Sequence, residues 1–240
     1  MVTDPAASRA AQPPLGGGLV LALDAAGGDG TLALLRDGTC VAETTVVMRG
    51  TREETLLPAI LCAVADAGAT LADLGAVVVG AGPGSFTALR VVGATAKGIA
   101  EGRGCPLYAA PSLALLVAAD DRTRRAGRWL ATLDALRGDR YLALVETDAA
   151  GAVRVVESLG LGSAAEVGPR AEVLGATPIG PDETMVAAPH ARGAVRTLAL
   201  IAAAGPVALP SWEPAYGRLA EAQVKWEAAA GRPLPTDRPA

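Results

Sequence analysis

The hydrophobic pattern divides the first part of the chain into strand-like and helix-like segments. Between residues 19 and 48, apolar runs are separated by glycine turns and by Asp37-Gly38, which predicts a meander of three strands. Over residues 51–67, apolar positions recur at three- and four-residue steps, which is typical of a helix with one buried face. The run Ala76–Val79 is wholly apolar and predicts a strand covered on both faces.

A second helix is predicted directly after this strand, over residues 84–102. It follows a glycine- and proline-rich turn, and Ser85 stands where a residue that caps a helix is expected. Its apolar face contains several very small residues and consists of Phe86, Leu89, Val92, Gly93, Ala96 and Ala100. Small side chains let another helix approach closely, so this face is a candidate helix-on-helix interface.

The remainder of the chain gives weaker signals. Residues 107–119 are expected to begin a second lobe, with an Ala/Leu-rich helix after Pro111 and Ser112. Another helix is predicted over about 191–204, with short strands around 153–157 and 184–186. In the C-terminal tail, Glu221 and Lys225 have the i, i+4 spacing of a short solvent-facing helix. The tail is expected to be anchored on the body by three aromatic side chains, Trp212, Tyr216 and Trp226.

An internal repeat relates the two halves of the chain. Residues 21–35 align without a gap with residues 131–145, and eight of the fifteen positions are identical. Both copies place an aspartate, Asp24 or Asp134, at the end of an apolar strand before a glycine turn and a second strand. We therefore expect an α/β fold with two lobes of like topology, each a mixed sheet with flanking helices. The expected divisions are a disordered tail over 1–18, lobes over 19–106 and 107–208, and a C-terminal tail over 209–240.

Composition restricts the classes of function. The net charge of −4 argues against broad electrostatic contact with nucleic acid, although the sequence has a local basic patch of Arg122, Arg124, Arg125 and Arg128. No apolar stretch is long enough for a signal peptide core or a bilayer span, which predicts a soluble cytoplasmic protein. The three separated cysteines fit small buried hydrophobic residues of a reducing compartment: Cys40, Cys62 and Cys105.

The turn and helix after Ala76–Val79 carry a family resemblance. Residues 82–90 read Gly-Pro-Gly-Ser-Phe-Thr-Ala-Leu-Arg, which resembles the Gly-Pro-Gly-Ser-Phe-Thr-Gly-Leu-Arg signature of the TsaB (YeaZ) family, with Ala88 in place of a glycine. The segment 134–141, the helix containing Leu56-Leu57-Pro58 and the Pro-x-Tyr-Gly-Arg sequence at 214–218 are also similar to family members. The resemblance implies a two-lobed, actin-like fold of the ASKHA superfamily, related to ribonuclease H.

The resemblance also implies a role in threonylcarbamoyladenosine (t6A) modification of tRNA. A TsaB-like chain is expected to be non-catalytic and to bind and activate a TsaD-type catalytic subunit, together with a TsaE-type ATPase, with tRNA contacted indirectly. The helices matching 51–67 and 84–102 would form the TsaD contact, and the same face could support a homodimer when the chain is alone. The expected interface residues are Leu56, Ile60, Phe86, Leu89, Arg90, Gly93, Thr95 and Lys97.

The two repeated aspartates are the candidates for polar chemistry. Asp24 and Asp134 could face a nucleotide and position a hydrated Mg²⁺ beside its phosphates, or they could simply bond to their own turns. The resemblance leaves open ATP or ADP with Mg²⁺ at the interface with a partner. The rival function from another class is a stand-alone ATP-dependent phosphotransferase of the same fold.

Other catalytic arrangements receive little support. His190 is the only histidine, so the chain has no histidine pair for a metal, and it is expected to be a loop residue. Ser85 does not lie in a G-x-S-x-G turn, which argues against a serine hydrolase. The dinucleotide-like pattern at residues 28–33 is followed by a strand where a phosphate-binding helix would be needed. No catalytic or metal-binding residue is therefore predicted.

Overall fold

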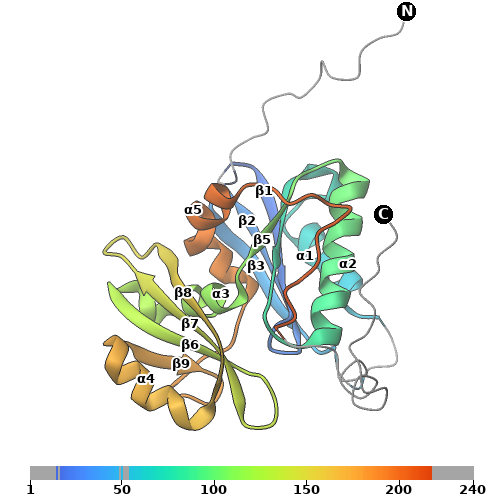
Figure 1. Cartoon of the computed structure of the whole chain (residues 1–240). Coiled ribbons are helices and arrows are strands. Elements are labelled where there is room, and N and C mark those ends of the chain that lie inside the picture. The colour runs from blue at the N-terminus through green and yellow to red at the C-terminus, as the bar shows by residue number, and fades with distance from the viewer. Residues whose placement is uncertain (1–14, 16, 49, 51–53, 218–240) are drawn as a thin grey trace, which may run out of the picture.

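Two five-stranded sheets form the two lobes of the protein. The computed structural model describes residue 15, residues 17–48, residue 50 and residues 54–217. The lobes lie side by side, with helices on the faces of each sheet (Figure 1). The predicted two-lobed α/β fold is confirmed.

The first sheet combines an antiparallel meander with two parallel strands. Strands β1 and β2 form a hairpin, β3 adds to β2, and β4 and β5 continue parallel from β1 in the order β3-β2-β1-β4-β5. The strand bounds are Leu19–Asp24 (β1), Gly30–Arg36 (β2), Thr39–Val46 (β3), Leu74–Gly80 (β4) and Leu107–Ala110 (β5). A short 3-10 turn, η1 (Leu71–Asp73), leads into β4.

Side chains of the central strands alternate between two apolar layers. Leu21 and Leu23 face the cluster shared with α1 (Leu56–Asp66) and α2 (Phe86–Arg103). Val20 and Ala22 face the opposite layer, which α5 (Ala194–Ala204) covers after the short turn η4 (Ala191–Gly193). Because both faces are buried, β1 and β4 are nearly continuous apolar runs.

The second sheet repeats this topology. Its strand order is β10-β9-β6-β7-β8, with β6, β7 and β8 antiparallel and β9 parallel to β6. The strand bounds are Gly127–Asp134 (β6), Asp139–Thr147 (β7), Val153–Ser163 (β8), Thr177–Gly180 (β9) and Met185–Val186 (β10). The helical segments are α3 (Ser112–Ala119), η2 (Asp121–Arg124), η3 (Ala164–Glu166) and α4 (Val167–Leu174).

The predicted boundary between the lobes falls too early in the chain. Residues 107–110, which we expected to begin the second lobe, form β5 and pair in parallel with β4 of the first sheet. The helix predicted after Pro111 and Ser112 is present as α3. Helix α5 was likewise assigned to the second lobe, but it covers a face of the first sheet.

The gapless alignment of residues 21–35 with residues 131–145 agrees with the structure in the first strand of each hairpin. In the second strand it is wrong by one residue. Leu23 pairs with Leu32 in the first lobe, whereas Leu133 pairs with Tyr141 and not with Leu142. The second turn is shorter because Leu136 and Arg137 both adopt positive φ angles, of 64° and 58°. A one-residue shift exchanges the two faces of a strand, so Leu142 points to the layer under α4.

Three smaller expectations change. Leu15, placed in the disordered tail, is buried against the first lobe with 6% of its surface exposed. Cys62 is exposed on α1 and not buried. Strand β9 and helix α4 were not predicted at all.

The predicted short helix around 221–225 and Trp226 lie outside the described residues. In the part of the chain that the structure describes, no helix has both the length and the apolar character needed to cross a membrane.

Candidate functional site

The loop between β4 and α2 is held by segments that are distant in the sequence. The backbone N–H of Ser85 donates to the carbonyl of Ala26, 3.0 Å away, and that of Ala215 donates to the carbonyl of Ala81, 2.8 Å away. Ser85 occupies the N-cap position of α2, but its side chain makes no capping hydrogen bond. Gly82 has a φ of +86°, and a Cβ there would collide with the carbonyl oxygen of Ala215. These contacts fix where α2 begins.

Asp24 lies beneath this loop and is almost fully buried, with 1% of its surface exposed. Its carboxylate accepts hydrogen bonds from the Ser112 hydroxyl at 2.5 Å and from the backbone N–H of Ala26 at 3.0 Å. The Ser112 oxygen in turn accepts from the backbone N–H of Gly82 at 3.0 Å. Burial raises the pKa of Asp24 to about 6, and the two hydrogen bonds oppose this rise. Asp24 therefore ties β1 to the start of α3 and to the loop.

The prediction that Asp24 faces a nucleotide is wrong in this structure. Its neighbour Gly80 lies so close that a Cβ there would collide with the carboxylate. Both carboxylate oxygens are engaged within the chain, and the side chain has no path to solvent-borne phosphate or Mg²⁺. The alternative interpretation, a carboxylate that stabilises its own turn, describes Asp24 correctly.

Asp134 has a different environment, at the exposed end of the β6–β7 hairpin. Its Oδ1 accepts from the backbone N–H of Leu136 at 3.0 Å and from Arg140 at 3.1 Å. Arg140 also pairs with Asp182, so it is shared between two carboxylates. Asp134 remains accessible, with 49% of its side chain exposed. The two repeated aspartates therefore have different environments, one buried and one exposed.

The remaining residues do not supply another site for Mg-nucleotide. Within the residues that the structure describes, no group of three His, Cys, Asp or Glu side chains could hold a metal ion. A shallow hollow of about 310 Å³ lies between the end of α2 and residues 206–209, but neither repeated aspartate lines it.

On α1, the structure separates inward from outward residues. Leu56 and Ile60 were predicted to contact a partner, but they are 1% and 0% exposed in the core of the first lobe. Their neighbours Leu57 and Leu61 are 41% and 46% exposed. The helix therefore has apolar side chains on both sides, and the predicted interface residues are the inward ones.

On α2, the predicted residues divide in the same way. Leu89 and Gly93 are buried inside the chain, so they offer no free surface to a partner. Phe86, Thr95 and Lys97 are partly buried, and Arg90 is exposed above the Phe86 ring at 5.4 Å. The small-residue face that we expected to receive a partner helix is covered at Gly93 by Trp212 and Pro214 of the same chain.

The outward sides of α1 and α2 carry exposed apolar side chains that the sequence prediction missed. We call these positions the α1–α2 face and define it by Leu57, Leu61 and Val91, with the small residue Ala94. The sequence did contain a signal for these outward residues. The adjacent apolar pairs at 56–57 and 60–61 place apolar side chains on two sides of α1, whereas a helix with a single buried face needs them on one side. Both helices pack on the same side of the first sheet (Figure 1).

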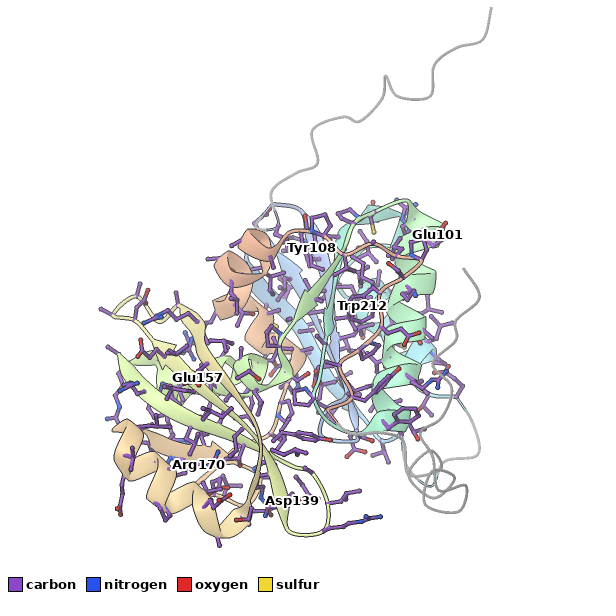
Figure 2. All side chains as sticks on the ribbon, viewed as in Figure 1. Glu101, Tyr108, Asp139, Glu157, Arg170 and Trp212 are labelled. Carbon is purple, nitrogen blue, oxygen red and sulfur yellow. The ribbon has the colours of Figure 1, made fainter. Side chains whose placement is uncertain are left out.

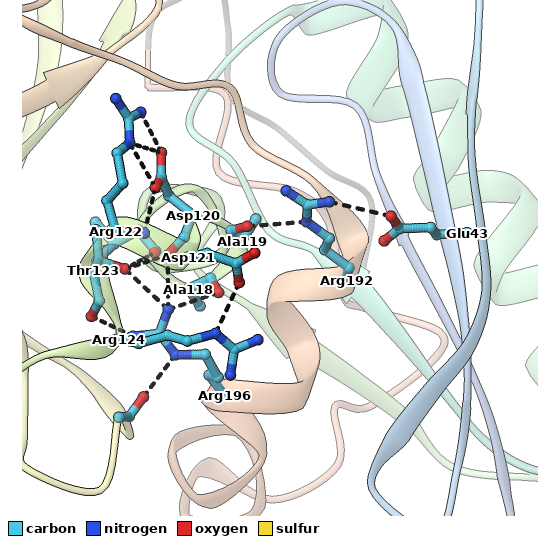
Figure 3. A network of polar contacts seen from close by, with 12 residues as sticks. Glu43, Ala118, Ala119, Asp120, Asp121, Arg122, Thr123, Arg124, Arg192 and Arg196 are labelled. Carbon is cyan, nitrogen blue, oxygen red and sulfur yellow. Dashed lines mark hydrogen bonds and ion pairs between the residues drawn. The ribbon is translucent and has the colours of Figure 1, made fainter.

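The predicted basic patch is largely neutralised. Arg122 pairs with Asp120 at 2.5 Å, and Arg124 pairs with Asp121 at 2.8 Å (Figure 3). Arg128 pairs with Glu146 at 3.1 Å. These acidic partners reduce the positive charge that a nucleic acid backbone would meet here.

Part of this chain is similar in sequence to known proteins. Residues 49–157 match the protein-family model of TsaD, tRNA N6-adenosine threonylcarbamoyltransferase. The chain is 37% identical over 128 residues to an uncharacterised protein of Mycobacterium tuberculosis, which covers 49% of this chain and 61% of that protein. It is 33% identical over 129 residues to the tRNA threonylcarbamoyladenosine biosynthesis protein TsaB of Escherichia coli, which covers 54% of this chain and 55% of that protein. The resemblance to the TsaB family is confirmed.

Solved structures show the same fold. A YeaZ protein of Pseudomonas aeruginosa superposes with a TM-score of 0.65 at 23% identity, covering 82% of this chain and 99% of that chain. Another structure from P. aeruginosa, described as similar to the peptidase YEAZ, gives a TM-score of 0.69 at 24% identity, covering 83% and 99%. In sequence, the matched part spans less than two thirds of the length of these TsaB and mycobacterial relatives.

One of these solved structures is described as similar to a peptidase, but the contacts of His190 in this chain are those of a turn residue. Nδ1 of His190 accepts a hydrogen bond from the backbone N–H of Arg192 at 3.1 Å, so it begins the short turn η4. Burial lowers the pKa of His190. The interpretation of this histidine as a loop residue is confirmed.

Proposed function

We propose that this chain is a non-catalytic accessory subunit that binds and activates a TsaD-type catalytic subunit in t6A modification of adenosine 37 of tRNA. The E. coli and Bacillus subtilis relatives, both named tRNA threonylcarbamoyladenosine biosynthesis protein TsaB, support this role. A TsaE-type ATPase is the further expected partner, and tRNA is contacted mainly through the other subunits. The assembly would act in the cytoplasm.

The observation that carries the proposal is the α1–α2 face. Leu57, Leu61 and Val91 are 41%, 46% and 38% exposed on two helices whose other sides are already packed on the sheet. Exposed apolar side chains gathered on one face mark a contact surface more often than scattered ones do. The family resemblance independently assigns the partner contact to these same two helices.

The test is to charge the α1–α2 face without touching the core. The double variant Leu57→Glu/Leu61→Glu should bind the TsaD protein of the same organism at least about tenfold more weakly, because desolvated apolar contacts would be lost. The thermal stability of the isolated chain should change little, since both side chains are already exposed. Affinity is measured by titration calorimetry, and complex mass by light scattering after size exclusion.

The matched control is Val173→Glu on α4. Val173 is also an apolar helix residue and is 88% exposed, but it lies in the second lobe away from the α1–α2 face. Its variant should bind TsaD like the unaltered chain. Equal binding by the double variant and the control would refute the proposed contact, and self-association lost only in the double variant would assign the face to a homodimer.

A stand-alone phosphotransferase is not favoured by any feature of the site. Asp24, which would have to face Mg-ATP, is locked under the β4–α2 loop. The isolated chain should therefore show no ATP turnover that Asp24→Asn abolishes. ATP or ADP with Mg²⁺ bound jointly by this chain and a partner belongs to the proposed complex and is tested by the same titrations with nucleotide present.

A further inference from the structure

The segment after α5 crosses back over the first lobe. Residues 205–217, which we call the strap, run from the end of α5 along α2 toward the start of that helix (Figure 1). Trp212 points from the strap toward α2 (Figure 2). A Cβ added to Gly93 would lie 3.3 Å from Pro214 and 3.6 Å from Trp212, and its nearest neighbours all belong to the strap. Gly93 is thus the point where strap and helix approach closely.

Hydrogen bonds attach the strap to the first lobe along its length. The backbone N–H of Val207 donates to the carbonyl of Leu107 at 2.8 Å. In the middle of the strap, Lys97 Nζ donates to the carbonyl of Trp212 at 3.0 Å. Near the end, Ala215 donates to the β4–α2 loop, as described above. The strap therefore holds the last strand of the sheet, the middle of α2 and the loop before it.

The end of the strap also contacts the second lobe. The hydroxyl of Tyr141, on β7, donates to the carbonyl of Tyr216 at 3.0 Å. The Tyr216 ring packs against Phe86, the first residue of α2, with ring centroids 4.4 Å apart. A Cβ on Gly217 would collide with the Tyr141 ring. Tyr216 thus joins the second lobe to the start of α2.

The strap leaves the α1–α2 face open. At 100° per residue, Phe86, Gly93 and Lys97 lie on one flank of α2, while Val91 and Ala94 lie on the outward side. Among the contacts described for residues 205–217, those with these positions involve the first group. Any influence of the strap on a partner bound to the outward side must therefore act through the position of α2.

We propose that the strap is a positioning element, which clamps α2 between the two lobes and thereby fixes the α1–α2 face for its partner. This inference rests on the proposed function for its binding consequence. Gly93, Tyr141 and Tyr216 would act through the position of α2, which makes them positioning residues. The proposal predicts that loosening the strap frees the β4–α2 loop and weakens partner binding without altering the face itself.

The first experiment displaces the strap from inside. Gly93→Leu would place a side chain where Pro214 and Trp212 pack, while Gly168→Leu, on α4, meets no atom within 4 Å and serves as the control for replacing a helical glycine. Hydrogen exchange followed by mass spectrometry should show about tenfold faster exchange in peptides covering residues 81–92 and 205–217 of Gly93→Leu only. Unchanged exchange of residues 81–92 when the strap exchanges faster would overturn the proposal.

The second experiment removes single hydroxyl groups and keeps the aromatic rings that pack in the core. Tyr141→Phe removes only the hydroxyl that donates to Tyr216, and Tyr108→Phe removes a hydroxyl from β5 that makes no contact with the strap among the described contacts. Tyr141→Phe should weaken binding of the TsaD-type protein about fivefold, whereas Tyr108→Phe should not. Binding that is insensitive to both Tyr141→Phe and Gly93→Leu would overturn the positioning role.

Failure of the proposed function is distinguishable from failure of this inference. If the unaltered chain does not bind the TsaD-type protein, the proposed function is wrong, and the exchange measurement on the isolated chain still decides whether the strap holds the loop. If the unaltered chain binds, and Leu57→Glu/Leu61→Glu, Gly93→Leu and Tyr141→Phe lose affinity while Val173→Glu, Gly168→Leu and Tyr108→Phe do not, both proposals are supported.

Discussion

At the scale of single residues, Asp24 and Asp134 differ through their surroundings and not through their sequence context. Both end an apolar strand before a glycine-containing turn. Asp24 is enclosed by the β4–α2 loop and α3, whereas Asp134 stands at an open hairpin beside Arg140. The repeat could identify the two positions, but it could not show that Ser112 and Gly80 enclose one of them, because those residues lie on other elements.

The raised pKa of Asp24 predicts a specific dependence of stability on pH. Its pKa is about 6 in the folded chain and near 3.8 when exposed, so between these values the folded chain holds a proton that the unfolded chain has lost. This contribution is complete below pH 3.8 and is lost as pH rises through about 6. Its size is about 3 kcal/mol, since one pKa unit corresponds to about 1.4 kcal/mol.

Asp24→Asn should remove this contribution, because an amide does not ionise. The difference in unfolding free energy between the variant and the unaltered chain should change by up to about 3 kcal/mol from pH 4 to pH 7 in urea titrations. A difference that stays constant over this pH range would contradict the environment assigned to Asp24.

At the scale of elements, α3 and its C-terminal end show how a buried helix is terminated. All eight residues of α3 are buried, so its last carbonyl groups cannot be satisfied by water. Arg196 of α5 donates to the carbonyls of Ala118 and Asp120 at 3.0 and 3.1 Å and to that of Thr123 at 2.6 Å (Figure 3). One guanidinium thus completes the end of the helix.

Arg196→Met should therefore destabilise the protein by about 3 kcal/mol, because several buried carbonyls would lose their charged donor. Arg196→Lys should recover only part of this loss, since an ammonium group lacks the planar fork of donors. The measurement is urea unfolding followed by circular dichroism. Arg170→Met, which removes a partly exposed i, i+4 ion pair on α4, is the control and should cost less than about 0.5 kcal/mol. Equal effects of the two methionine variants would contradict the role given to Arg196.

Elements with a clear period could be predicted from the sequence, and elements defined by distant partners could not. The β1–β2–β3 meander and helices α1, α2 and α5 follow from apolar spacing and turn residues. β5 was assigned to the second lobe because four apolar residues before Pro111 do not show which strand they pair with. The inward and outward sides of α1 could not be distinguished, since adjacent leucines fit either side until the sheet is placed.

At the scale of the whole molecule, the two lobes are interlocked. Chain order gives α5 to the second lobe, yet it covers the first sheet, and α3 contributes Leu115 to one lobe's core and Leu113 to the other's. A backbone N–H at Ala191 donates to the Thr31 hydroxyl at 3.0 Å, and Arg192 joins Glu43 on β3 to the end of α3. Neither lobe has a complete core by itself.

The interlocked core predicts that the protein unfolds in one cooperative transition. Urea unfolding followed by fluorescence in the double variants Trp129→Phe/Trp226→Phe and Trp212→Phe/Trp226→Phe, each of which keeps one tryptophan in a different lobe, should give the same midpoint as circular dichroism of the same variant. A fragment ending after residue 190 should not form a stable first lobe. Separate transitions for the two reporters would show that the lobes fold independently.

The return of α5 and the strap to the first lobe has a consequence for how the protein is made. Strands β1 to β5 leave the ribosome first, but the apolar layer containing Val20 and Val78 is completed by α5, and the flank of α2 at Gly93 is covered by the strap. Domains whose cores close early can fold during synthesis. Here the first half of the nascent chain must keep an apolar sheet face unpaired until residues 194–217 have emerged, which makes it a natural client for chaperones that bind during translation.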